Sequence, residues 1–174
     1  MNATALLLTG TVGSGKTTTA ERIGERLKSN GMPHAVVDLD AIRQFWPAPD
    51  GDPFGSAMEL QNLGALVANY VGAGARRLVL AGVCESKADR TRYERVLAVP
   101  LTVCRLRVDA DTVDHRLRER HRHDDIQLLQ WHRERAGELD RVLDQADVAD
   151  MEVAVGQRSR DEVADAVLSL LAWT

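Results

Sequence analysis

Residues 10–17 read Gly-Thr-Val-Gly-Ser-Gly-Lys-Thr, and this stretch decides which fold the rest of the chain can adopt. An apolar run at residues 5–8 precedes it, and a segment with apolar residues at helical spacing follows it. A strand, a glycine-rich loop and a helix in this order form the context that a phosphate-binding loop requires. A chance glycine-rich turn would explain the glycines, but not the whole pattern in this context.

The residue types of this loop predict how it would bind a nucleoside triphosphate. Small residues let the backbone fold around a phosphate chain with its N–H groups pointing inward, and the following helix adds the positive end of its dipole. We expect Lys16 to reach the β- and γ-phosphates and Thr17 to place its hydroxyl on Mg²⁺. The expected nucleotide-binding residues of the loop are Gly10, Thr11, Val12, Gly13, Ser14, Gly15, Lys16, Thr17 and Thr18.

The composition indicates one globular domain spanning residues 1–174, with 44% hydrophobic residues to build a core. A net charge of −4 argues against a protein that binds nucleic acid or an anionic membrane, because both need a dense positive surface. No apolar run approaches the ~20 residues that a membrane span needs. Two cysteines, far apart in sequence, indicate neither a disulfide framework nor a metal site, which favours the reducing cytoplasm. No feature indicates an oligomeric state.

Two aspartates follow the second predicted strand, residues 35–37. The strand-helix-strand unit should be right-handed and parallel, which puts Asp38 at the same sheet edge as the phosphate loop. Alternate residues of an extended segment share a side, so we expect Asp38 and Asp40 to face the phosphates together. One carboxylate would hold Mg²⁺, with Thr17, and the other would accept a proton from an attacking hydroxyl. The alternative is that Asp40 caps a helix over residues 41–46.

Beyond a turn-rich loop at residues 47–55, the pairing of Ser56 with Glu59 predicts a capping box at the start of the next helix. That helix leads to a third strand, residues 78–83, which is a continuous apolar run of the kind buried on both faces in a parallel sheet.

Polar residues follow the end of the third predicted strand. Ligands of open α/β sheets bind outside the carboxyl edge, so Glu85 and Arg90 are candidate substrate contacts. A solvated helix face would also explain Arg90. No acidic residue stands inside the strand in the usual Walker B position. We therefore assign Mg²⁺ binding to Thr17 and Asp38, with Glu85 as a further candidate.

An arginine-rich segment follows the fourth predicted strand, residues 101–108. Arg116 and Arg120 are four residues apart, and like charges at that spacing repel in an isolated helix, which favours a polyanionic partner. A basic surface balanced by neighbouring acidic residues is the alternative. Four of the five histidines fall between residues 115 and 132, but their spacing matches no recognised metal-ligand pattern.

The last part of the chain predicts a strand and a helix. Residues 148–155 are expected to form the fifth strand, and Ser159 with Glu162 predicts a capping box that starts the final helix. The loop between them supplies candidates for adenine contacts, namely Gly156, Gln157 and Arg158.

Together, the phosphate loop, the two aspartates, the arginine-rich segment and the final glycine loop resemble the small P-loop kinases of the nucleoside monophosphate kinase-like group. Adenylylsulfate kinase, shikimate kinase, gluconate kinase and chloramphenicol phosphotransferase belong to this group. The resemblance implies an α/β, three-layer P-loop NTPase fold with a five-stranded parallel sheet in the order 2-3-1-4-5, and an arginine-rich lid at residues 116–135. It also implies transfer of the γ-phosphoryl group of ATP, with Mg²⁺, to a hydroxyl of a small-molecule acceptor.

The resemblance also assigns roles to single residues. The segment Asp38-Leu39-Asp40-Ala41-Ile42-Arg43 looks like the acidic, acidic, arginine pattern of adenylylsulfate and shikimate kinases, which implies Asp40 as the base and Arg43 as a substrate-binding residue. Arg116 and Arg120 match lid arginines that flank the adenine and the phosphates, and with Lys16 they complete the expected catalytic set. Residues 45–55 match none of these families, so the sequence leaves the acceptor open.

Two other functions, and other acceptors within the kinase class, are alternatives to this prediction. We reject a GTPase switch for two reasons. Residues 52–55 do not follow a predicted strand, and Ser86 stands at a position where guanine recognition requires asparagine or threonine. A nucleotide-binding module without phosphotransfer would need neither Asp40 nor Arg43 nor a lid, so their joint presence favours a kinase. Within the kinase class, an antibiotic, a nucleoside or a nucleotide remains an alternative acceptor to adenylylsulfate, shikimate or gluconate.

Overall fold

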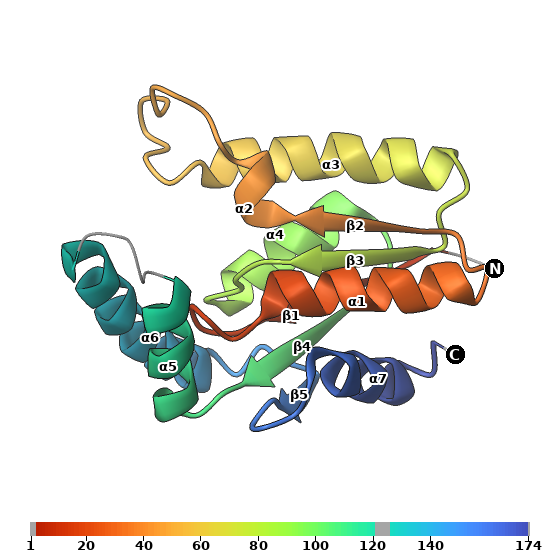
Figure 1. The fold of residues 1–174 in the computed structure, drawn as a ribbon. Coiled ribbons are helices and arrows are strands. Elements are labelled where there is room, and N and C mark those ends of the chain that lie inside the picture. Colours follow the sequence, from red (N-terminus) through yellow and green to blue (C-terminus); the bar gives the residue numbers. More distant parts are fainter. Residues whose placement is uncertain (1–2, 121–125, 174) are drawn as a thin grey trace.

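Five parallel strands form one sheet in the order β2-β3-β1-β4-β5, which confirms the predicted topology (Figure 1). The computed structural model describes residues 3–120 and 126–173, and the side chain of Arg120 lies outside this description. Apolar residues of β1 pair with β3 on one side and β4 on the other, so β1 is central. The strands are β1 (Thr4–Thr9), β2 (His34–Asp38), β3 (Arg77–Ala81), β4 (Leu101–Arg107) and β5 (Met151–Ala154).

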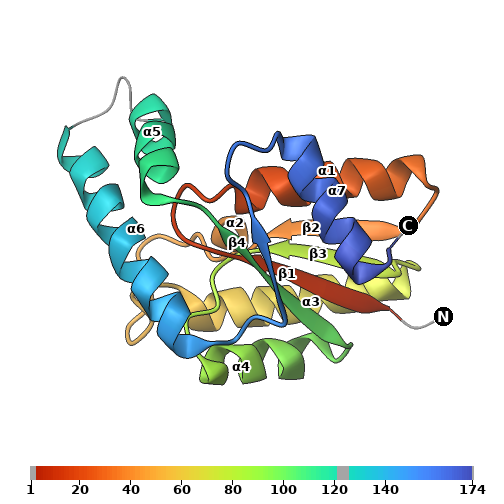
Figure 2. The same cartoon turned by 90° about the horizontal axis from the view of Figure 1, so that it is seen from below.

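Helices cover both faces of the sheet and extend beyond one edge. Helices α1 and α7 pack together on one face, α3 and α4 lie on the other, and α5 and α6 lie beyond the carboxyl ends of the strands (Figures 1 and 2). The helices are α1 (Lys16–Ser29), α2 (Leu39–Ile42), α3 (Ser56–Gly72), α4 (Lys87–Leu97), α5 (Ala110–Arg120), α6 (Ile126–Ala146) and α7 (Arg160–Leu171).

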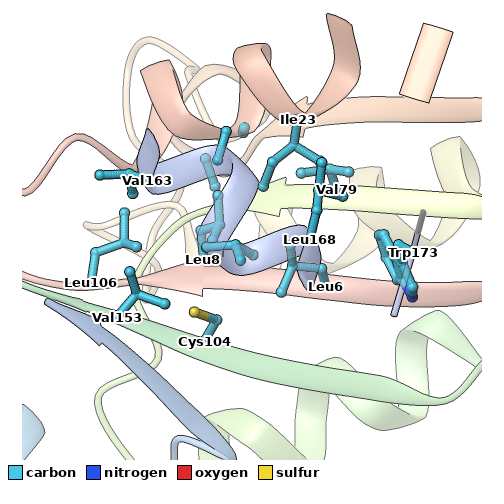
Figure 3. Packing of buried hydrophobic residues seen from close by; sticks show 14 of the residues in the cluster. Leu6, Leu8, Ile23, Val79, Cys104, Leu106, Val153, Val163, Leu168 and Trp173 are labelled. Carbon is cyan, nitrogen blue, oxygen red and sulfur yellow. The ribbon is translucent and has the colours of Figure 1, made fainter. Parts of the chain in front are cut away.

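The central strand divides the core into two layers. Because alternate residues of a strand point to opposite faces, Leu6 and Leu8 pack under α1 and α7, whereas Leu7 packs toward α3 and α4. Figure 3 shows Leu6 and Leu8 with Ile23 of α1 and Leu168 of α7. Full burial of one such side chain contributes about 1.5–3 kcal/mol. This packing fixes the end of β1, from which the glycine-rich loop begins.

One predicted capping box forms and the other does not. Ser159 and Glu162 make the expected reciprocal contacts at the start of α7. The box predicted for Ser56 and Glu59 is wrong, because Gly55 is the N-cap of α3 and makes no side-chain contact. An Asp52 carboxylate oxygen instead accepts hydrogen bonds from the N–H groups of residues 57 and 58, at 2.9 and 3.2 Å.

Several element boundaries differ from the sequence prediction, chiefly those of α2, of β5 and of β3, which ends at Ala81 rather than at residue 83. Asp38, rather than Asp40, caps α2, since an Asp38 carboxylate oxygen accepts a 2.9 Å hydrogen bond from the N–H of Asp40. Asp40 therefore stands in the first turn of a short helix and not in an extended segment, and α2 ends at Ile42. The fifth strand is shorter than predicted, with Val148 buried in the connection that precedes it.

A buried arginine connects α6 to the sheet. The Arg105 side chain in β4 is only 4% exposed, and its guanidinium group lies 2.8 Å from the Asp140 carboxylate and 2.7 Å from that of Asp144. Both aspartates belong to the carboxyl-terminal part of α6. A buried guanidinium group needs such partners to offset its desolvation, so this end of α6 is held on β4. Among the helices that the structure describes, none has the length and apolar character needed to cross a bilayer.

Candidate active site

A cleft of about 1710 Å³ lies beyond the carboxyl ends of the strands. Its walls come from the glycine-rich loop, α2, the start of α3, the segment after β3, and helices α5 and α6. The structure brings together, along this cleft, most of the residues that the sequence singled out: residues 12–18, Asp38, Asp40, Arg43, Glu85, Arg116 and Arg158.

The backbone of the glycine-rich loop needs glycine at defined positions. Gly13 and Gly15 have φ angles of 79° and 94°, a left-handed conformation in which a side chain would be strained. At Gly10, a Cβ atom would lie 2.7 Å from the Ser14 hydroxyl oxygen and 2.8 Å from the Leu106 carbonyl oxygen. The loop therefore packs too closely at Gly10 for any larger residue. The left-handed glycines at positions 13 and 15 let the backbone curve around a phosphate chain.

Lys16 and Thr17 begin α1 and face the cleft. The Lys16 ammonium group donates to the carbonyl oxygens of Gly10 and Thr11, each at 3.0 Å, which keeps the charge above the loop. The Thr17 hydroxyl donates a 2.8 Å hydrogen bond to the Asp38 carboxylate, 21 residues away in the chain. Hydroxyl and carboxylate oxygens are the ligand types that Mg²⁺ prefers, so this pair fits the ion.

A connected set of polar side chains begins at Asp40. Asp40 forms an ion pair with Arg43, and the guanidinium group of Arg43 lies 3.6 Å from the carboxylate of Glu59. Glu59 in turn accepts a 2.7 Å hydrogen bond from the hydroxyl of Tyr93. Sequence reasoning missed Glu59 and Tyr93, because they meet across 34 residues and belong to different helices.

Burial raises the pKa values of two members of this set, Glu59 and Tyr93. Desolvation raises the pKa of Glu59 above its ordinary value, while the Tyr93 hydrogen bond and the Arg43 charge oppose the shift. The pKa of Tyr93 is also raised, chiefly by burial and then by the neighbouring Glu59 carboxylate. The Tyr93 hydroxyl therefore remains a hydrogen-bond donor, which holds Glu59 in place behind Arg43.

One of the two predicted lid arginines contacts the glycine-rich loop. The Arg116 guanidinium group donates to the carbonyl oxygens of Gly13 and Ser14, at 3.3 and 3.4 Å. Arg120 is the last residue of α5, and its side chain and residues 121–125 lie outside the described part of the chain. The Arg116 contacts place α5 beside the position expected for the phosphates.

Helix α6 contributes contacts that the sequence did not reveal. Its Arg135 side chain lies 2.7 Å from the carboxylate of Glu85, which joins α6 to the segment after β3. The Thr11 hydroxyl is buried and donates a 2.6 Å hydrogen bond to the Ala136 carbonyl oxygen. Trp131 of the same helix also lines the cleft, as does Phe54 from the loop before α3.

Some predicted contacts lie elsewhere. Arg90 donates to the Val148 carbonyl oxygen at 2.7 Å and pairs with Asp150, so it joins α4 to the segment before β5 rather than the cleft. Gly156 and Gln157 form a turn after β5 and do not belong to the described lining of the cleft, although Arg158 does. Arg158 donates to the Ala154 carbonyl oxygen at 3.1 Å.

A sequence comparison matched a family model over the first part of the chain. The family model for adenylylsulphate kinase matches residues 2–48, which hold the glycine-rich loop and both aspartates. A search among curated proteins found no match to the sequence.

Solved structures of other proteins, small kinases among them, share the fold over nearly the whole chain. A *Mycobacterium tuberculosis* APS kinase in complex with AMPPNP and APS is 23% identical, with a TM-score of 0.63 and 98% of each chain covered. The tunicamycin resistance protein of *Deinococcus radiodurans* is 20% identical, with a TM-score of 0.70 over 99% of this chain and 98% of that one. *Acinetobacter baumannii* shikimate kinase in complex with shikimate is 16% identical, with a TM-score of 0.63 over 99% and 94%. The predicted resemblance to small P-loop kinases is thereby confirmed, and the chain has their fold.

Proposed function

We propose that this protein is an ATP- and Mg²⁺-dependent phosphotransferase that moves the γ-phosphoryl group to a hydroxyl of a small molecule. The observation that carries the proposal is that the carboxylate of Asp40 lines the same cleft as Lys16 and the glycine-rich loop. A module that only binds nucleotide has no need for a carboxylate beside the phosphate site. The cleft, at about 1710 Å³, has room for a nucleotide and a second molecule.

Four residues of the cleft have separate roles in this reaction. Asp40 takes the proton of the acceptor hydroxyl as the new bond forms between the acceptor oxygen and the γ-phosphorus. The bond from the γ-phosphorus to the oxygen that bridges it to the β-phosphorus breaks, and ADP leaves. Arg43 orients the Asp40 carboxylate through their ion pair. Lys16 and Arg116 stabilise the negative charge on the transferring group.

Thr17 and Asp38 are the residues that would hold Mg²⁺, which supplies charge neutralisation at the β- and γ-phosphates when bound. Arg120 and the turn at residues 156–158 remain proposed nucleotide contacts, and Glu85 a proposed acceptor contact. Two free, buried cysteines fit a reducing cytoplasmic setting.

The test combines an acceptor screen with an Asp40→Asn variant. ADP release is measured with adenylylsulfate, shikimate, gluconate, nucleosides and antibiotics as acceptors. With the best acceptor, Asp40→Asn is expected to lower kcat by about 10²–10⁴-fold, because the proton loses its base, while the Kd for ATP changes by less than about twofold. Asp50→Asn, in the exposed loop before α3, is the matched control. Ordinary turnover in Asp40→Asn would remove the base assignment, and ATP binding without any phosphorylated acceptor would leave a nucleotide-binding module.

A further inference from the structure

Two aromatic side chains line the cleft and are largely exposed to solvent. Phe54, in the loop before α3, is 80% exposed, and Trp131, on α6, is 58% exposed. Both elements lie beyond the carboxyl ends of the strands (Figure 1). Leu60, Val83 and Tyr93 line the same cleft. A bound molecule with a flat apolar body would bury these aromatic rings, which contribute more to binding than other side chains.

The arginines on this side of the cleft are already paired with carboxylates. Arg43 pairs with Asp40, and Arg135 lies 2.7 Å from Glu85. Arg92, which also lines the cleft, lies 3.2 Å from the Asp89 carboxylate. An anionic acceptor would compete with these carboxylates for the guanidinium donors, and their negative charge would repel it.

Carboxylates also outnumber arginines among the lining residues that come from residues 40–43, α3, the segment after β3, α4 and α6. In the described lining, the carboxylates of Asp40, Glu59, Glu85 and Asp89 stand against the guanidinium groups of Arg43, Arg92 and Arg135. The phosphate end differs at Arg116, whose guanidinium group donates to main-chain carbonyl oxygens of the glycine-rich loop. A main-chain carbonyl is neutral, so a phosphate competes with it for these donors more easily than with a carboxylate.

We infer that the phosphoryl acceptor is an alcohol without negative charge, whose aromatic or similarly flat apolar body packs against Phe54 and Trp131 while its hydroxyl faces Asp40. This inference rests on the proposed function and names the acceptor class of that site. The segment matched by the adenylylsulphate kinase model ends at residue 48, before Phe54 and Trp131, so that match does not extend to these residues. The chemistry of the cleft sets this acceptor apart from sugar acids, shikimate and adenylylsulfate.

The first test varies the charge and the ring of the acceptor separately. The probes are 3-phenylpropane-1,2-diol, 3-phenyllactate, glycerol and glycerate, with adenylylsulfate, shikimate and gluconate as additional anions, and kcat/KM is measured for each with saturating ATP and Mg²⁺. The neutral aromatic diol is expected to exceed both its carboxylate analogue and glycerol by at least about tenfold, the effect of roughly 1.4 kcal/mol. An anion as the best acceptor overturns the inference and leaves phosphotransfer standing. If no probe is phosphorylated, the inference is wrong; the proposed function is wrong as well only if ATP binds and no nucleoside or antibiotic of the wider screen is phosphorylated either.

The second test removes the rings. Phe54→Ala and Trp131→Ala are each expected to raise the KM for the neutral aromatic alcohol about tenfold, with the KM for ATP changed by less than about twofold, because the aromatic contact is lost. Trp131→Phe keeps a ring and should restore the KM to within about threefold of the original. Phe45→Ala and Trp46→Ala are matched controls, since both side chains are exposed and neither belongs to the described lining. An unchanged KM in both Phe54→Ala and Trp131→Ala contradicts the inference.

Discussion

The hydroxyl of Thr11 donates a buried 2.6 Å hydrogen bond to the carbonyl oxygen of Ala136, across 125 residues of sequence. The first residue belongs to the glycine-rich loop and the second to α6, which also carries Trp131 and Arg135. The carbonyl oxygen of Thr11 accepts a hydrogen bond from Lys16 at 3.0 Å. Thr11 therefore links the proposed phosphate site to α6, which lines the cleft.

Replacing Thr11 by valine tests this link. The shape is kept, but the hydroxyl is lost and the buried Ala136 carbonyl loses a donor, so we expect the free energy of unfolding to fall by about 1–3 kcal/mol. Chemical denaturation measures the change. Thr91→Val is the control, because the exposed Thr91 hydroxyl donates to the Lys87 carbonyl oxygen within α4 and its loss should cost less than about 0.5 kcal/mol. Equal stabilities of the two variants would contradict a structural role for the Thr11 bond.

Removing the charge of Lys16 should abolish phosphotransfer. Lys16→Ala deletes a cation that would stabilise the transferring group, and we expect kcat/KM to fall by at least about a hundredfold. The readout is ADP release with the best acceptor, alongside circular dichroism to verify the fold. Lys28→Ala, at the exposed end of α1, should leave both unchanged. Activity retained in Lys16→Ala would argue against phosphate binding at this loop.

Glu59 should make stability depend on pH. Burial raises the pKa of Glu59 in the folded protein above the ordinary value of 4.5 that applies to the unfolded chain. The folded state therefore binds the Glu59 proton more tightly than the unfolded state does. The stability that comes from this tighter proton binding is fully present below about pH 4.5, and it is lost as the pH rises through the higher pKa of Glu59 in the folded state. Glu59→Gln cannot titrate, so its stability relative to the original protein should increase from pH 4.5 upward and then level off.

Denaturant titrations at a series of pH values between about 4 and 8 measure this difference. Glu21→Gln, at an exposed position of α1, is the control, and its stability relative to the original protein should stay nearly constant over the series. A flat difference for Glu59→Gln as well would mean that Glu59 does not carry a raised pKa.

The two thiols should be inert in the folded protein. Burial raises the pKa of Cys84 to about 11 and that of Cys104 to about 12, and both side chains are fully buried. Since the thiolate is the reactive form, we expect negligible reaction with Ellman's reagent at pH 8 and rapid reaction of both thiols in guanidinium chloride. Fast reaction of either thiol without denaturant would show that the core opens around it.

The sequence alone predicted the elements that depend on residues close together in the chain. Apolar runs predicted the strands, the glycine-rich motif predicted the end of β1 and the start of α1, and Ser159 with Glu162 predicted the start of α7. The strand order came from the resemblance to small P-loop kinases. The helix predicted to begin near Ser56 is present as α3, although the cap at its start comes from Asp52 and Gly55.

Contacts between distant residues could not be predicted in this way. The pattern of Ser56 and Glu59 fits a capping box, but burial beside Tyr93 takes the Glu59 side chain away from the helix end. The sequence places Arg90 after β3, but only the packing of α4 against Val148 and Asp150 shows that its side chain lies away from the cleft, whereas Arg92 lines it. Periodicity describes one element at a time, whereas these contacts depend on how two elements meet.

The ion pairs of Arg105 hold the carboxyl-terminal part of α6 on the sheet. Asp140 and Asp144 join the last two turns to β4, so we expect any tilt of the helix to pivot close to Ala136. From there to Ile126 the axis is about 15 Å long, and a tilt of about 10° would shift that end by about 2.6 Å. A spin label at the exposed Leu128 would register such a displacement, while one at the exposed Arg141 would remain nearly stationary.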